Sequence, residues 1–141
     1  MRFWDSSALV PLLLSERDTA RTERWLRDDS DVVVWTLTRV ELLSALARRR
    51  RHEPAAARHL STAREELLVA WDRWSEITAI DLVRRHAERL VETHPLRAAD
   101  ALQLGAALVA AEDDSTAIEF VTLDRQQALA AGREGFRVLG P

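Results

Sequence analysis

Four acidic residues stand beside apolar residues at points where the sequence predicts that a strand ends or a helix begins. They are Asp5, Glu41, Asp100 and Asp124. A single acid at such a point is usually a helix cap, and Asp100 alone is explained equally well by the helix dipole, which favours a first-turn acid by roughly 0.3–1 kcal/mol. Four converging acids repel one another and cannot all stay ionised without cations. Together they predict a site for a divalent metal ion.

The metal chemistry of such a site follows from its ligands. Mg²⁺ and Mn²⁺ take oxygen ligands in octahedral geometry, and a protein that supplies only carboxylates leaves water and phosphate oxygens to complete the shell. The ion then activates a water molecule, orients the phosphate and stabilises charge on the leaving oxygen. We therefore expect Asp5, Glu41, Asp100 and Asp124 to act as metal ligands in phosphodiester cleavage. Ser6 either binds a metal-bound water or caps a helix, and we favour capping.

The four acids can meet only if the chain forms a parallel sheet, because open parallel sheets bind ligands beyond the carboxyl ends of their strands. Apolar runs and helical periodicity alternate along the sequence, which predicts an α/β domain with a mostly parallel sheet. Strands are expected at residues 2–5, 32–35, 74–78 (weak), 118–122 and 136–139, and helices at 6–14, 18–28, 39–52, 55–71, 80–95, 96–111 and 125–131.

The ends of two helices carry specific expectations. Ser6 or Ser7 is expected to cap the first helix, and Thr36 or Thr38 the helix that contains Glu41. Pro11 conflicts with the first helix unless it lies in its first turn. The helix at 96–111 is apolar around most of its circumference, so it is predicted to be buried.

Composition excludes several other kinds of chemistry. The chain has no cysteine, which removes disulfides, thiolate metal sites and cysteine nucleophiles. All 20 basic residues are arginine, so there is no lysine for a Walker-type phosphate loop or a Schiff base. The net charge of −3 gives no overall attraction to nucleic acid.

The location of the protein is also predicted from the sequence. No apolar run reaches the 18 or so residues that a bilayer-spanning helix needs. The first residues, MRFWDSS, contain no signal-peptide hydrophobic region. We expect a cytoplasmic protein without a membrane partner.

Four segments resemble the PIN domain, and more narrowly the VapC-type toxins of bacterial toxin–antitoxin pairs. They are DSSALV from Asp5, Thr-x-x-Glu ending at Glu41, LRAADALQLGAAL around Asp100, and FVTLDRQQALAAGREGFRVL around Asp124. Each motif is weak by itself, but together they cover essentially the whole chain in the usual order.

This resemblance implies a fold and an activity. It implies one PIN-like domain over residues 1–141, with three α/β/α layers. It further implies an endoribonuclease that depends on Mg²⁺ or Mn²⁺, with its acids at Asp5, Glu41, Asp100 and Asp124. VapC-type toxins are usually homodimers and are inhibited by a small antitoxin. The four arginines at residues 48–51 either grip RNA phosphates, form a solvated helix end, or contact the antitoxin.

Other functions fit the sequence less well. A phosphatase with an aspartate nucleophile needs a second Asp two residues after the first, where this chain has Ser7. A receiver domain needs a paired acid and a lysine, and a non-catalytic binding module does not need four converging acids. A PIN nuclease in RNA processing, without a toxin role, remains the main alternative.

Overall fold

The fold is organised around one five-stranded parallel sheet, and the computed structural model describes all 141 residues. The strand order is β3-β2-β1-β4-β5, and every neighbouring pair runs parallel. This confirms the predicted sheet, including its weak third strand. The strands are β1 (Arg2–Trp4), β2 (Val32–Trp35), β3 (Ser75–Ile77), β4 (Glu119–Val121) and β5 (Arg137–Leu139).

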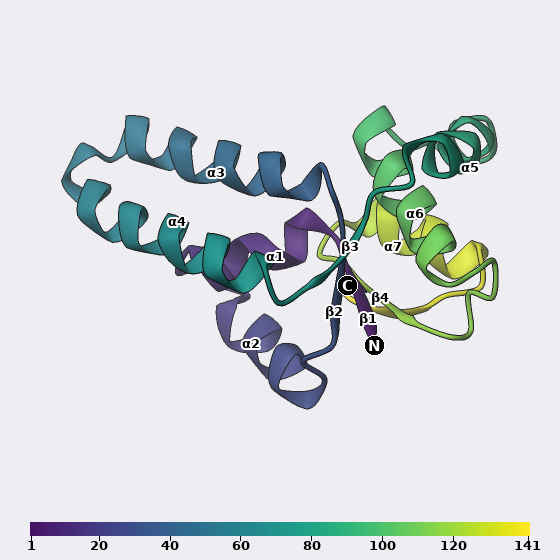
Figure 1. The fold of residues 1–141 in the computed structure, drawn as a ribbon, viewed down its shortest axis with the longest axis horizontal. Coiled ribbons are helices and arrows are strands. Elements are labelled where there is room, and N and C mark those ends of the chain that lie inside the picture. Colours follow the sequence, from purple (N-terminus) through teal and green to yellow (C-terminus); the bar gives the residue numbers. More distant parts are fainter.

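Helices cover both faces of the sheet, as predicted for a three-layer α/β/α fold. One side carries α1 (Ser6–Leu13), α2 (Thr19–Asp28), α3 (Thr38–His52) and α4 (Ala57–Trp71), and the other carries α5 (Ile80–Thr93), α6 (Ala98–Ala110) and α7 (Arg125–Arg133) (Figure 1). A 3₁₀ turn, η1 (Pro54–Ala56), joins α3 to α4, which run side by side as a long helical hairpin. None of these helices has the length and apolar character of a bilayer-crossing segment.

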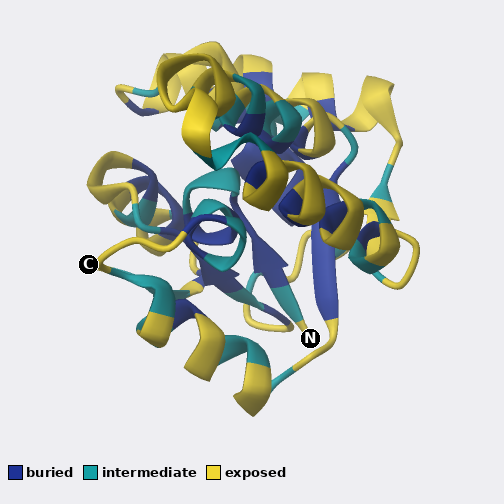
Figure 2. Ribbon diagram, turned by 90° about the vertical axis from the view of Figure 1, so that its left-hand side faces the viewer, coloured by how far each residue is buried: buried dark blue, intermediate teal, exposed yellow.

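Alternate strand residues point to the two helical layers, so the protein has a separate core on each face of the sheet. Phe3 and Phe120 stack face to face, with ring centroids 5.5 Å apart, on the side of α5, α6 and α7. Their neighbours Trp4 and Val121 are buried on the opposite side, against α1, α3 and α4. The buried strands and the exposed outer faces of the helices are visible in Figure 2.

Helix α6 is the buried helix that the sequence predicts. Of the eight residues from Ala101 to Leu108, seven are buried and only Leu102 is half-buried. At Gly105 an added Cβ would lie 2.9 Å from the carbonyl oxygen of Val83, so the absence of a side chain lets α6 lie directly on α5. This close packing fixes the first turn of α6, where Asp100 is located.

The predicted caps of α1 are wrong, and the reason concerns the site. Asp5, not Ser6 or Ser7, is the N-cap, and its carboxylate accepts a hydrogen bond from the Ser7 backbone N–H. An aspartate is as good a cap as a serine, and the strand ends one residue earlier than expected, which moves the cap position to Asp5. Pro11 lies inside α1 beyond its first turn.

The expected threonine caps of α3 are also wrong. Leu37 occupies the N-cap position, and no side chain caps this helix. Thr38 is buried, and its hydroxyl accepts a hydrogen bond from the side chain of Gln103 on α6 at 2.7 Å. The threonine therefore joins α3 to α6 rather than capping α3.

A buried histidine fastens α7 to the end of α5. The Nε2 atom of His94 lies 2.7 Å from a carboxylate oxygen of Glu134, and Arg89 donates two hydrogen bonds to the same carboxylate. Glu134 is the only polar partner of the buried His94 ring, so Glu134→Ala leaves that ring without a hydrogen-bond partner. We expect the free energy of unfolding to fall by about 1–3 kcal/mol.

Chemical denaturation at pH 7 measures this loss. Glu92→Ala is the matched control, because Glu92 is an exposed acid on α5 without an ion pair, and it should change stability by less than about 0.5 kcal/mol. If both variants lose the same stability, His94 and Glu134 do not fasten the helices.

Candidate active site

The candidate site lies where the sheet changes its direction of winding. The chain passes from β1 outward to β2 and β3, and later returns to the other side of β1 to form β4 and β5. Ligands of open α/β sheets bind at such a switch point, beyond the carboxyl ends of the strands. Asp5 directly follows β1, and Thr122 and Asp124 follow β4, so all three leave the sheet at this place.

Asp5 is held in the protein by one of its two carboxylate oxygens. Its side chain is buried, with 2% of the residue exposed. Oδ2 accepts hydrogen bonds from the Ser7 backbone N–H, the Ser7 hydroxyl and the Thr122 hydroxyl. Oδ1 has only the Ser6 hydroxyl, at 3.5 Å, which is the limit of a hydrogen bond. One oxygen thus anchors the side chain, and the other keeps its lone pairs almost unused.

The surroundings of Asp5 disfavour its negative charge. The pKa of the Asp5 carboxyl is raised to about 6. Burial is the main cause, and the negative charge of Glu41 acts in the same direction, while the hydrogen bonds from Ser7 and Thr122 partly oppose the shift. At neutral pH the carboxylate is therefore mostly ionised but without a compensating cation. A bound cation would stabilise it.

Glu41 faces Asp5 across the Ser6 side chain. The Ser6 hydroxyl donates to Oε2 of Glu41 at 2.8 Å, and the amide of Gln103 donates to Oε1 at 3.0 Å. The glutamate is half-buried in the first turn of α3. Its carboxylate is thus oriented from both sides before any ligand arrives.

Gln103 is a site residue that the sequence analysis missed. It is buried, its amide nitrogen donates to both Thr38 and Glu41, and its own oxygen has no partner. The available signal was its polarity within an otherwise apolar helix, one turn after Asp100 and on the same side of that helix.

The other two acids form a second pair. Asp124 is the exposed N-cap of α7 and accepts a hydrogen bond from the Gln127 backbone N–H at 2.8 Å. Asp100 is half-buried in the first turn of α6. The pKa of its carboxyl is raised mainly by burial and also by the negative charge of Asp124, while Arg97 opposes this shift. The Gln127 side chain also donates to the Asp100 backbone carbonyl, which joins the two helices here.

The structure places the four predicted acids at one edge of the sheet as two pairs. Thr122 connects the pairs, because its hydroxyl donates to Asp5 and accepts from the Asp124 backbone N–H at 3.1 Å. No three acidic or histidine side chains lie close enough to form a complete set of protein ligands for one ion. Any ion here would need oxygen ligands from water or substrate as well.

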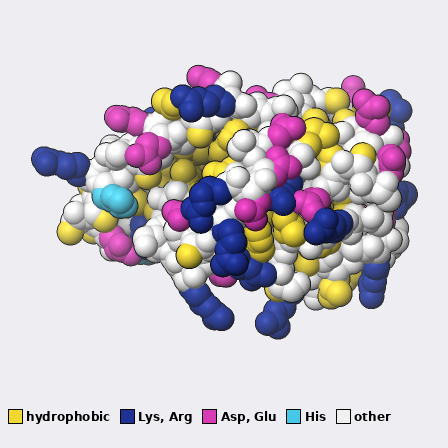
Figure 3. Space-filling model, turned by 90° about the horizontal axis from the view of Figure 1, so that it is seen from below, with side chains coloured by type: hydrophobic (Ala, Val, Ile, Leu, Met, Phe, Trp, Pro, Cys, Tyr) yellow, Lys and Arg dark blue, Asp and Glu magenta, His cyan; other side chains and the backbone are white.

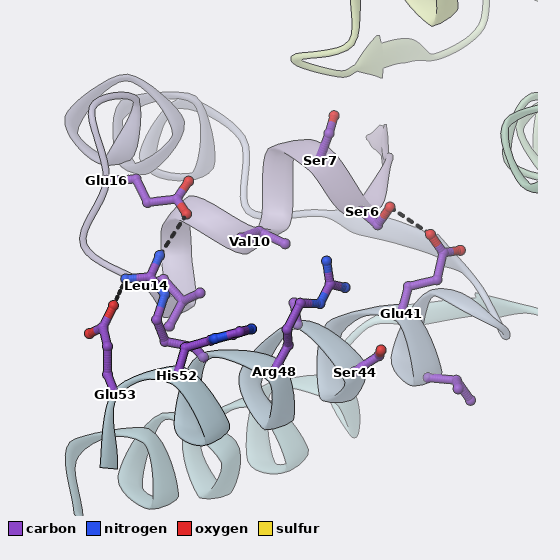
Figure 4. Close-up of a pocket in the computed structure, with 13 residues that line it drawn as sticks. Ser6, Ser7, Val10, Leu14, Glu16, Glu41, Ser44, Arg48, His52 and Glu53 are labelled. Atoms are coloured by element: carbon purple, nitrogen blue, oxygen red, sulfur yellow. Dashed lines mark hydrogen bonds and ion pairs between the residues drawn. The ribbon is translucent and has the colours of Figure 1, made fainter. Parts of the chain in front are cut away.

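A groove of about 730 Å³ begins at Ser6 and Glu41 and runs between α1 and α3. Ser6 and Glu41 lie at one end of the groove, and the side chains of Arg48 and His52 extend into it further along α3 (Figure 4). Its position beside Asp5 and Glu41 makes it a path by which an extended ligand can reach the acids.

Comparisons with known proteins agree with this architecture. The model of the PIN domain family matches residues 2–133. The crystal structure of PAE2754 from Pyrobaculum aerophilum is similar at 23% identity and a TM-score of 0.60, covering 97% of this chain and 81% of that one. FitAcB from Neisseria gonorrhoeae is similar at 16% identity and a TM-score of 0.60, covering 99% and 96%. No curated protein sequence matches the chain.

Proposed function

This chain belongs to the PIN domain family, whose members are typically nucleases, and from that premise we propose that it is an endoribonuclease dependent on Mg²⁺ or Mn²⁺. The observation that carries the proposal is the state of Asp5. A buried carboxylate beside Glu41, with one oxygen anchored and the other almost without donors, suits a group that contributes an oxygen to a cation.

The donor set fits a hard divalent ion. Asp5 and Glu41 offer carboxylate oxygens, Ser6 offers a hydroxyl between them, and the chain has no cysteine thiolate to compete. Asp100 and Asp124, which Thr122 connects to Asp5, are the further acids that we propose to take part in the site. When bound, the ion supplies an activated water molecule and stabilises charge on the phosphate that is cleaved.

The remaining polar residues of the site hold the acids in place. Ser7 and Thr122 fix one oxygen of Asp5, so its side chain is held in one orientation. Ser6 and Gln103 each hold one oxygen of Glu41. Such preorganisation avoids reorientation of the ligands when the substrate binds, and it excludes water from the buried side of the site.

Gln103→Leu is expected to slow cleavage because Glu41 loses the donor to Oε1. A hydrogen bond to a charged group contributes about 1.5–3 kcal/mol, so the rate should fall roughly 10- to 100-fold if the glutamate must be oriented for activity. Single-turnover cleavage at saturating enzyme measures the effect. Gln126→Leu, at an exposed position on α7, is the control and should keep the parent rate. An unchanged rate for Gln103→Leu would show that Gln103 does not orient Glu41 for cleavage.

The activity itself is tested with a pool of single-stranded RNA of random sequence. Purified protein is incubated with Mg²⁺, with Mn²⁺ or with EDTA, and the new RNA ends are sequenced. A DNA pool of the same design tests the choice of nucleic acid. We expect internal cuts in RNA with either metal and none in EDTA. A pool that stays intact under all conditions, or cuts that persist in EDTA, would overturn the proposal.

We further propose that the enzyme acts in the cytoplasm as a VapC-like toxin, as a homodimer inhibited by a small antitoxin. The support is the resemblance of the four motifs over the whole chain. The chain is expressed with and without the adjacent gene, and growth and RNA ends are compared. Growth arrest that the neighbour relieves supports the toxin role. Harmless expression with discrete RNA cuts instead indicates a nuclease of RNA processing.

A further inference from the structure

The groove contains one arginine that has no acidic partner. Arg49, on the same helix, lies 3.5 Å from Glu16 and 3.3 Å from Glu53, so its charge is compensated. Arg48 also lines the groove but has no carboxylate within 4.0 Å and no hydrogen bond. Figure 4 shows its side chain extending from α3 toward α1. An exposed guanidinium directed into a groove is free to bind an anion.

The position of this guanidinium relative to the acids is set by the helix. Arg48 follows Glu41 by seven residues, which places both on the same face of α3, about 10 Å apart along its axis. Both line the same groove, whose volume of about 730 Å³ is that of a site for a ligand of drug size rather than for a duplex. One or two nucleotides of a single strand fit in this space.

We propose that Arg48 binds a phosphate of single-stranded RNA adjacent to the phosphate that is cleaved, and so sets the position of the strand in the groove. This inference rests on the proposed function. Arginine is suited to the role because its planar fork donates two hydrogen bonds to a phosphate and is always charged. Glu16 and Glu53 also line the groove, but their carboxylates pair with Arg49, which leaves Arg48 as the groove's unpaired arginine.

Arginine and acidic side chains are interspersed over the face shown in Figure 3, without a continuous basic patch. Ion pairs compensate the charge of several exposed arginines. Arg84 pairs with Asp81, for example, and Arg27 pairs with Glu23. Arg48 differs from these arginines because it is unpaired and lines the same groove as Glu41.

The test measures RNA binding as a function of salt. A fluorescent single-stranded RNA is titrated with Asp5→Asn protein in Mg²⁺, a form that should bind without cutting. Adding Arg48→Gln should weaken binding roughly tenfold and reduce the slope of log Kd against log salt by about 0.7, the value for one phosphate contact on a single strand. Arg51→Gln, from the same arginine run but outside the groove, should leave both unchanged. Thermal unfolding verifies that each variant is folded.

The outcomes separate this inference from the proposed function. If Arg48→Gln and Arg51→Gln bind RNA alike, or if only polyglutamate shows binding that depends on Arg48, the phosphate site is wrong. If the random RNA pool is never cut but binding depends on Arg48, the nuclease proposal fails and the binding site stands. In the active protein, Arg48→Gln should raise KM for long RNA without changing kcat. Shortening the RNA from one end should abolish that difference.

Discussion

Asp5→Asn is expected to abolish RNA cleavage and at the same time make the protein more stable at neutral pH. Asparagine is itself a good N-cap, and its side-chain oxygen can still accept the hydrogen bonds that hold Asp5 in place. It lacks the negative charge that a metal ion requires. Loss of function with a gain of stability is the pattern of a residue kept for chemistry rather than for folding.

The gain in stability depends on pH in a defined direction. Burial raises the pKa of Asp5 from 3.8 in the unfolded chain to about 6 in the folded protein. Between these values the folded state binds more protons, so the contribution of Asp5 to stability is fully present below pH 3.8 and is lost as pH rises through 6. At pH 7 the charged carboxylate costs on the order of 3 kcal/mol, since one pKa unit corresponds to about 1.4 kcal/mol.

Denaturant unfolding in EDTA at several pH values measures this effect. The difference in unfolding free energy between Asp5→Asn and the parent should be smallest near pH 4 and should grow until about pH 7. Asp72→Asn, an exposed acid at the end of α4, serves as the control and should show no such trend. A variant that is less stable than the parent at pH 7 would mean that Asp5 is a structural cap.

Asp100→Asn should also lose cleavage, by a factor on the order of 100 or more, while the fold stays intact. Asp100 is half-buried near Asp124, and both its burial and that neighbouring charge raise the pKa of its carboxyl, so removal of its charge relieves repulsion. If Asp100 served only the dipole of α6, the substitution would instead cost about 0.3–1 kcal/mol of stability and leave the activity unchanged.

Single-turnover cleavage and thermal unfolding of the same preparation distinguish these two roles of Asp100. Asp72→Asn, at an exposed acid without an ion pair at the end of α4, is the control for a change of net charge alone. An active but destabilised Asp100→Asn protein would show that Asp100 stabilises α6 and does not take part in cleavage.

The fold was predictable because its signals are local. Short apolar runs such as Val32–Trp35 alternate with segments of helical periodicity, and a chain with that alternation buries its strands between two layers of helices. The order of the strands was not predictable, since pairing of β1 with β4 depends on contacts far apart in the sequence. The ends of helices were also uncertain, because several residues near β1 and β2 are good caps and tertiary contacts decide among them.

The acids of the candidate site were selected from the sequence by their positions at strand ends and helix starts. The residues that hold them were harder to find. Thr38 was expected to cap a helix and instead accepts a hydrogen bond from Gln103, 65 residues away. Thr122 contacts Asp5, and the Leu123 backbone N–H donates to the Ser7 hydroxyl, only because β4 lies beside β1. Partners that the sheet brings together from distant segments leave no pattern in the sequence.

The most direct test of the account is the rate at which one RNA is cut internally as the Mn²⁺ concentration is raised, for the parent protein and for Asp5→Asn. The account predicts no cleavage by the parent in EDTA, a rate that rises with Mn²⁺ and saturates, and no cleavage by Asp5→Asn at any concentration. Equal rates for the two proteins, or a parent rate that does not respond to metal, would contradict it.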